Sequence, residues 1–215
     1  MQAARRLGVT QAYLSMVERG SRPVSDELAA TALKVYPLSA TARPLGVSVA
    51  ARQTEEFFKK ALGELGYPGF AYLKGRARLN PAELLLLALD TKDLDSRVTE
   101  ALPWLPFQFP ALNWEWLTTE AKLRDRQNRL AFVTELARQV AEATADRPRA
   151  NALSARVAAL ERSRLAAEDT LCRESMSEAE RRWLRSHRPK TAAHWNLLAD
   201  LKLEDLSHVY SEAAA

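Results

Sequence analysis

Apolar residues recur at intervals of three and four along most of this chain, the spacing that places them on one face of a helix. The clearest run is Leu130, Val133, Ala137 and Val140, which predicts a long amphipathic helix over residues 125–145. No segment shows the alternating pattern of a half-buried strand, and only seven residues are glycine. The sequence therefore predicts an all-α protein.

Capping residues and prolines place the ends of other predicted helices. One helix starts at Asn80-Pro81, one starts at the capping box of Ser177 and Glu180, and the last starts at Pro189. Further helices are predicted over residues 48–65, 93–102, 113–123 and 148–170. The residues predicted to face inward are Val49, Phe57, Ala61, Leu65, Leu153, Val157, Leu160, Ala167, Trp195, Leu198 and Leu201.

Residues 103–110 form an apolar peptide that is punctuated by three prolines. We interpret it as a buried, extended connector whose aromatic rings, with those of Trp114 and Trp116, fill the core of a helical domain. The alternative is an exposed groove for a partner protein.

The first 36 residues carry the most specific local pattern. Ala4 and Gly8 lie four apart, so a second helix can cross closely and the glycine can end the first helix in a tight turn. Thr10 is a natural N-cap for the next helix. The apolar residues predicted to hold the two helices together are Leu7, Val9, Leu14 and Val17, and those left facing outward are Gln11, Ala12, Ser15 and Met16. A third helix is predicted from the cap Ser25 to Pro37, with Leu28, Ala32 and Val35 buried.

These residues resemble the lambda repressor/Cro class of helix-turn-helix, also called the XRE family. The likeness covers residues 3–36 and rests on Leu7-Gly8-Val9-Thr10-Gln11, Leu14-Ser15, Glu18-Arg19-Gly20, Arg22 and Ser25. Members of the family are five-helix bundles whose third helix enters the major groove of DNA. The resemblance assigns that part to residues 10–19 of this chain.

The resemblance also implies which side chains bind DNA. Gln11 would offer its amide to an adenine edge, which presents one donor and one acceptor. Thr10 and Arg22 would bind phosphate, and Tyr13 would contact either the DNA backbone or protein. The full set implied to bind DNA is Thr10, Gln11, Ala12, Tyr13, Ser15, Met16, Arg19 and Arg22, in which Ala12, Ser15 and Met16 meet neighbouring base edges.

The chain departs from the family pattern at its start. The family places a complete first helix, and the beginning of the second, before the Ala-x-x-x-Gly unit, whereas here only Met1, Gln2 and Ala3 precede Ala4. We therefore expect an N-terminally incomplete module, from a start that is truncated or misassigned, or a module that borrows packing from downstream helices or from a second subunit.

Composition divides the chain into four parts. We predict a helix-turn-helix module over residues 1–36, a linker over 37–47 that is rich in small and polar residues, an all-helical domain over 48–210 and a tail over 211–215. The helical domain is expected to be an irregular bundle or a helical-repeat-like array.

The net charge of +4 favours polyanionic partners, and residues 147–190 hold eleven basic against six acidic residues. The arginines of this stretch are either a second phosphate-binding or acidic-partner surface, or a solvated face with Arg164–Glu168 and Glu178–Arg182 ion pairs. The eight arginines considered for this surface are Arg149, Arg156, Arg162, Arg164, Arg181, Arg182, Arg185 and Arg188. We favour the solvated face.

Other chemistry is not indicated. The single cysteine, Cys172, is predicted to be a core residue in a reducing compartment, and His187, His194 and His208 lack companions at metal-ligand spacing. We find no catalytic motif, no cofactor motif, no signal peptide and no apolar run that could span a membrane. The sequence predicts a cytoplasmic protein that is not an enzyme.

Together these observations predict a sequence-specific transcriptional regulator, a repressor that binds double-stranded operator DNA as a homodimer. Residues 48–210 would bind a partner or effector, as in the antitoxin of a toxin-antitoxin pair. The alternative is a helical adaptor that has lost DNA binding, and a third idea is RNA binding through the arginine stretch. Exposure separates the first two, because only the regulator needs Gln11, Ser15 and Met16 open beside Arg22.

Overall fold

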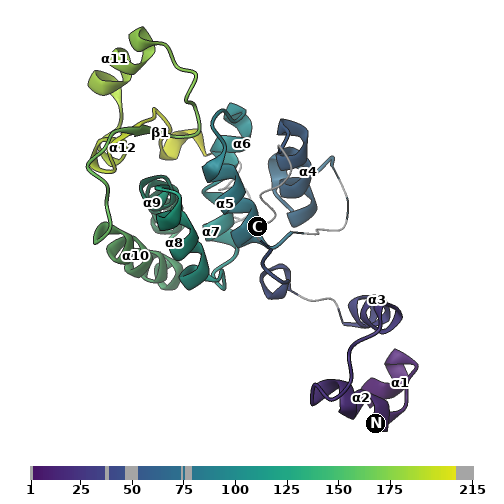
Figure 1. Cartoon of the computed structure of the whole chain (residues 1–215). Helices are drawn as coiled ribbons and strands as arrows, with labels where there is room; N and C mark the ends of the chain where they lie inside the picture. The colour runs from purple at the N-terminus through teal and green to yellow at the C-terminus, as the bar shows by residue number, and fades with distance from the viewer. Residues whose placement is uncertain (1, 37–38, 47–52, 74, 76–78, 207–215) are drawn as a thin grey trace.

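The computed structural model describes residues 2–36, 39–46, 53–73, 75 and 79–206, and confirms the all-α prediction (Figure 1). In the described residues the only strands are β1 (Asp169–Thr170) and β2 (Leu197–Leu198), which pair in parallel with Asp169 opposite Leu197. The helices are α1 (Gln2–Leu7), α2 (Gln11–Glu18), α3 (Asp26–Val35), η1 (Ala40–Ala42), α4 (Glu55–Leu65), η2 (Pro68–Phe70), α5 (Pro81–Asp90), α6 (Ser96–Ala101), α7 (Trp104–Gln108), α8 (Trp114–Leu123), α9 (Gln127–Ala143), α10 (Arg147–Glu161), α11 (Glu178–His187), α12 (Lys190–His194) and η3 (Leu203–Asp205).

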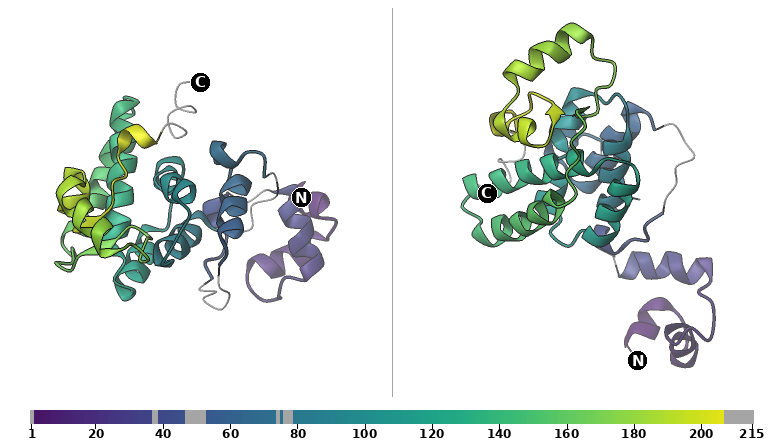
Figure 2. Two further views of the ribbon diagram at one scale, coloured as in Figure 1. Left: turned by 90° about the horizontal axis from the view of Figure 1, so that it is seen from above. Right: turned by 60° about the vertical axis from the view of Figure 1, so that its left-hand side comes forward.

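The chain folds as two unequal parts. Helices α1 to α3 form a small N-terminal module that projects from the remaining helices, which we call the body (Figures 1 and 2). Helix α2 therefore belongs to a part of the molecule that stands apart from the body (Figures 1 and 2).

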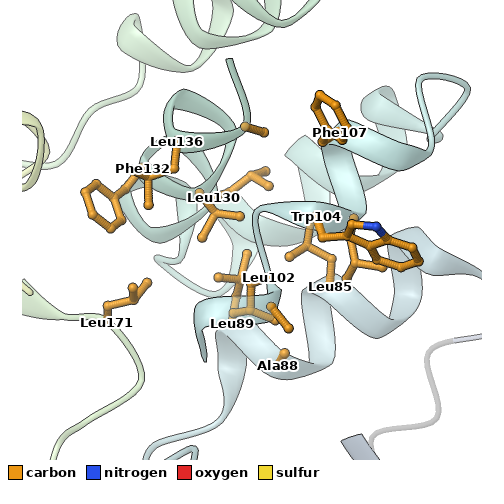
Figure 3. Packing of buried hydrophobic residues seen from close by; sticks show 14 of the residues in the cluster. Leu85, Ala88, Leu89, Leu102, Trp104, Phe107, Leu130, Phe132, Leu136 and Leu171 are labelled. Carbon is orange, nitrogen blue, oxygen red and sulfur yellow. The ribbon is translucent and has the colours of Figure 1, made fainter. Parts of the chain in front are cut away.

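The centre of the body is α9, whose apolar side chains are enclosed by neighbouring helices. Leu130, Phe132 and Leu136 are at most 1% exposed, and they lie in one cluster with Leu89 of α5 and Trp104 of α7 (Figure 3). Burying side chains of this size stabilises the fold by about 1.5–3 kcal/mol each. This cluster forms the main core of the body.

Polar side chains at the start of α9 anchor a distant segment of the chain. The Asn128 amide donates to the carbonyl of Leu165 (3.0 Å) and accepts from its N–H (2.9 Å). The fully buried Arg129 contacts both carboxylate oxygens of Asp169, at 2.7 and 2.8 Å. These contacts fix the extended segment between α10 and α11 against the body.

The segment that follows the N-terminal module is also anchored. The Asn80 side-chain amide donates to the carbonyls of Thr41 (3.1 Å) and Arg43 (2.8 Å), while its oxygen caps α5. Arg43 in turn donates to the carbonyl of Leu79 (3.2 Å). Part of the predicted linker is therefore held against the start of α5.

The prediction of an extended connector over residues 103–110 was wrong in its conformation. Residues 104–108 form α7, in which Trp104, Leu105 and Phe107 are buried as expected. Pro103 and Pro106 fit because the first turn of a helix has no carbonyl partner for its N–H groups, so proline loses no hydrogen bond there.

Three predicted helices are shorter than expected. The helix predicted over 148–170 ends at Glu161, and the helix predicted from Pro189 ends at His194, in both cases before a strand. Helix α4 begins at Glu55 rather than at residue 48, because Thr54 caps it; residues 48–52 of the prediction, with Val49, lie outside the described residues. Its buried face is Phe58, Ala61 and Leu62, so the assignment of Phe57 and Leu65 to the interior was only half right, since both are half-buried.

The arginine-rich stretch is ion-paired, but with partners other than those predicted. Arg164 pairs with Glu161 (3.2 Å), and Glu168 pairs with Arg185 (2.8 Å) because the chain turns after α10. Arg149 and Arg156 also lie over aromatic rings, those of Phe107 and Trp114, at 4.3 and 5.6 Å from the ring centroids. Much of this charge is thus used within the body.

Candidate nucleic-acid interface

The turn between α1 and α2 is built as the sequence predicts. Gly8 has a φ of +68°, a left-handed conformation that glycine adopts without strain. Its N–H donates to the carbonyl of Arg5 (3.2 Å), and the N–H of Val9 donates to that of Ala4 (3.0 Å). This pair of bonds closes the end of α1 and sends the chain directly into α2.

Helix α2 is held at both ends by bonds within the module. The Thr10 hydroxyl accepts from the N–H of Tyr13 (3.2 Å), which confirms Thr10 as the N-cap. At the other end Gly20 has a φ of +68°, and the N–H and the hydroxyl of Ser21 both donate to the carbonyl of Met16 at 2.9 Å. The boundaries of α2 therefore depend on its own sequence.

The interior of the module is small. Its fully buried apolar residues among those described are Ala4 and Leu7 of α1 and Leu28 of α3, at 4%, 9% and 6% exposure, and α1 packs against α3. Leu14 and Val17 of α2, which were predicted to pin the helices together, are half-buried. Helix α2 is thus supported from one side only.

The other side of α2 faces solvent. Gln11 and Ala12 are exposed, and Met16 keeps 41% of its surface exposed. Ser15 is half-buried and lies one turn after Gln11, on the same face. Because Thr10 and Arg19 are also exposed, α2 presents a continuous row of short and polar side chains from end to end.

Arg22 and Tyr13 form a stacked pair beside this row. The Arg22 guanidinium carbon lies 5.1 Å from the centroid of the half-buried Tyr13 ring, a cation–π contact. A shallow groove of about 600 Å³ runs past this pair, with Thr10, Ser25 and Glu27 among its walls. The stack holds an exposed cation close to the start of α2.

Two further cations on the module were not among the predicted residues. Arg5 and Arg6 are exposed on the last turn of α1, directly before the turn that leads into α2. The signal that would have found them is charge alone, because residues 1–36 contain five basic and three acidic side chains. Adjacent arginines at this position are well placed for backbone phosphates.

Within the described residues, no group of three His, Cys, Asp or Glu side chains is arranged to hold a metal ion. In the same part of the chain, no helix has both the length and the apolar character that crossing a bilayer requires.

The comparisons with known proteins agree with the geometry of the module. Residues 2–42 match the protein-family model described as helix-turn-helix, which includes α1, α2, α3 and η1. Comparison of the chain with curated proteins and with solved structures finds no match.

Proposed function

Because residues 2–42 form a helix-turn-helix of the lambda repressor/Cro (XRE) family, we propose that this chain is a DNA-binding transcriptional regulator whose α2 enters the major groove. The groove is wide enough to admit one α-helix, and base edges there differ for each base pair. The row of side chains on α2 would then supply the sequence preference.

One observation supports this function over a helical adaptor. The adaptor requires the outer face of α2 to be covered, and Gln11 and Met16 are instead exposed on a module that projects from the body. Arg22, the nearby cation, is exposed as well. An exposed polar helix face beside arginines favours a polyanionic duplex as the partner.

We assign the side chains of the site to three roles. Gln11 donates to and accepts from an adenine edge, while Ala12 and Met16 contact a thymine methyl group and Ser15 meets a neighbouring base edge. Phosphates are bound by Thr10 and by the arginines, which are Arg5, Arg6, Arg19 and Arg22. Tyr13 acts through its stack on Arg22 and so positions that guanidinium.

We propose more specifically that the chain is a cytoplasmic repressor that binds DNA as a homodimer. Two copies of a helix-turn-helix placed one helical turn apart would match a palindromic operator. The body would carry the dimer contact or bind a protein partner, such as the toxin of a toxin-antitoxin pair. A small gene next to this one would support the antitoxin role.

Gel-shift titration with the DNA upstream of the gene tests the assignment. We expect tighter binding to this DNA than to a scrambled duplex, and we expect Gln11→Ala to cost about 1–3 kcal/mol at one base position. The matched control is Gln108→Ala, because Gln108 is exposed on α7 in the body. Equal affinity for both duplexes would contradict sequence-specific binding.

Salt dependence tests the phosphate contacts separately. We expect Arg22→Ala to weaken binding to all sequences alike and to lower the slope of log affinity against log salt by about 1. Tyr13→Leu should give a smaller loss of the same kind, since it removes the stack and keeps the cation. An unchanged slope in Arg22→Ala would remove Arg22 from the interface.

A further inference from the structure

The body contains a cavity of about 900 Å³ that the DNA-binding role leaves unused. It lies between α11, the segment that precedes α11, the start of α6 and the residues that follow β2. In Figure 1, α11 lies above α12 and β1, and the long segment that precedes α11 runs from β1 up to its start. Its volume is that of a pocket for a small organic ligand.

The floor of the cavity is apolar. Leu171, Met176, Leu184 and Leu198 line it, and each is at most 7% exposed in the absence of any ligand. Three of them, Met176, Leu184 and Leu198, form a hydrophobic cluster separate from the main core. Because these side chains are packed on one another, an apolar group of a ligand would meet only their outer edge.

The rim carries an exposed aromatic pair. Trp183 keeps 53% of its surface exposed although it lines the cavity, and its ring stacks on that of His187 with centroids 4.4 Å apart and planes 6° from parallel. The His187 Nδ1 also lies 2.8 Å from the carbonyl of Trp183, which fixes the imidazole on the indole. The indole is thus held in place with surface left for a ligand.

The cavity lining holds more acidic than basic side chains, whereas the whole chain has a positive net charge. The cavity is lined by the carboxylates of Asp93, Glu100, Asp200 and Asp205 and by the cations of Arg173 and Lys202. Asp93 accepts from the N–H of Ser175 (2.8 Å), and Asp205 accepts from the N–H of Lys202 (3.0 Å). Arg173 is already paired with Glu180 at 2.7 Å, a residue outside the lining. In a chain of net charge +4, this concentration of carboxylates selects against anions such as nucleic acid.

We propose that this cavity binds a small organic cation that carries an apolar group, such as an arylalkylamine. The apolar group would lie against the leucine side chains, and the ammonium would lie among the carboxylates, beside the Trp183 ring that His187 stacks on one face. The exposed Asp200 is the carboxylate best suited to a test, because no described hydrogen bond or ion pair engages its side chain. This ligand site extends beyond the DNA-binding function.

The test is a titration of the full chain with phenethylamine, followed through the indole N–H signals in nitrogen–proton NMR spectra. Trp183→Phe identifies the Trp183 signal. We expect that signal to move saturably with phenethylamine, and we expect phenylacetate, which has the same ring and the opposite charge, to bind at least about tenfold more weakly. Asp200→Asn should weaken phenethylamine binding about threefold, the effect of losing one partly solvated ion pair.

The matched control is Asp26→Asn, which makes the same change on the exposed start of α3. It should leave phenethylamine binding unchanged, and unmoved signals from the other four indoles show that each variant is folded. Equal shifts with the amine and the acid, or no saturation, would overturn the proposal. Because the titration contains no DNA and the cavity lies outside residues 2–42, its failure would leave the DNA-binding proposal standing.

Discussion

The guanidinium of Arg129 has no exposed surface, and it joins three segments of the body. It contacts Asp169 through two nitrogens and donates to the carbonyls of Leu89 (2.8 Å) and Thr91 (3.2 Å). Its desolvation is offset by its bonds to a carboxylate and to two carbonyl groups. The side chain therefore determines how the end of α5 and strand β1 meet α9.

We expect Arg129→Met to lower the free energy of unfolding by about 3–5 kcal/mol, because the substitution removes the buried guanidinium that binds both oxygens of Asp169 and two carbonyls. Urea unfolding followed by tryptophan fluorescence measures the loss. The control is Arg138→Met on the same helix, where the ion pair with Glu135 is nearer solvent and is worth at most about 1 kcal/mol. Similar losses in the two variants would contradict the role given to Arg129.

Cys172 lies beside Arg129 and is fully buried, with its thiol 3.3 Å from the carbonyl of Ala88. Burial raises the pKa of this thiol from 9.0 to about 11. We expect no reaction with a thiol reagent at pH 8 until the chain is unfolded by urea. Because the folded state holds the proton more tightly, stability should fall as the pH rises from about 9 to about 11. Rapid labelling of the folded chain would show that the site opens.

At the scale of elements, several helices end with a left-handed residue that closes two hydrogen bonds. Gly8, Gly20 and Gly66 supply this conformation without strain, whereas Asp125 and Ala145 adopt it at φ values of 56° and 58°. A non-glycine residue there costs roughly 1 kcal/mol. The backbone is therefore strained at Asp125, after α8, and at Ala145, after α9, because neither residue is glycine.

Ala145→Gly should stabilise the chain by up to about 1 kcal/mol, because it removes this strain at an exposed position. The reverse change, Gly66→Ala, should destabilise it by a similar amount, since nothing lies within 4 Å of the added methyl group and the backbone alone is affected. Chemical unfolding of both variants measures the difference. A destabilised Ala145→Gly would show that unfolded-state entropy outweighs the strain.

Element boundaries that depend on neighbouring residues could be predicted from the sequence. Thr10, Ser25, Asn80 and Ser177 cap their helices as expected, because a cap bonds to an N–H within three residues. The end of α10 could not be predicted in this way. The chain turns there to reach Asn128, whose bond to Leu165 joins residues 37 positions apart.

The same distinction applies to the two candidate sites. The α2 interface is local, so its spacing of Gly8, Thr10 and Gly20 could be recognised directly. The cavity combines α6, α11 and the residues after β2, and only the folded body brings Asp93, Trp183 and Asp200 together. Trp183 alone was indistinguishable from a core tryptophan in the sequence.

At the scale of the molecule, the N-terminal module and the body differ in the size of their interiors. The module buries Ala4, Leu7 and Leu28, whereas the body has a continuous core around α9. Local opening requires less free energy where fewer apolar contacts are lost. The module is therefore the part expected to open first.

Leu28→Ala should lower the free energy of unfolding of the module by about 2–5 kcal/mol. It should therefore abolish DNA binding while leaving the body folded. All five tryptophans lie at position 104 or later, so their fluorescence reports on the body alone. Gel shift and urea unfolding of the variant separate the two effects. The control is Leu160→Ala in α10, which should lower the unfolding midpoint of the body. A lowered midpoint in Leu28→Ala would mean that the two parts unfold together.

Asn80 holds the carbonyls of Thr41 and Arg43 against the body, which would limit the spacing of half-sites in the proposed operator. Four backbone steps separate the end of α3 at Val35 from Ser39, and four steps reach at most about 14 Å. In a dimer assembled through the body, each α2 would be confined to a small volume around its own attachment point. Such a dimer would bind only operators whose half-sites lie a fixed distance apart. Inserting a few base pairs between the half-sites would abolish binding even with both half-sites intact.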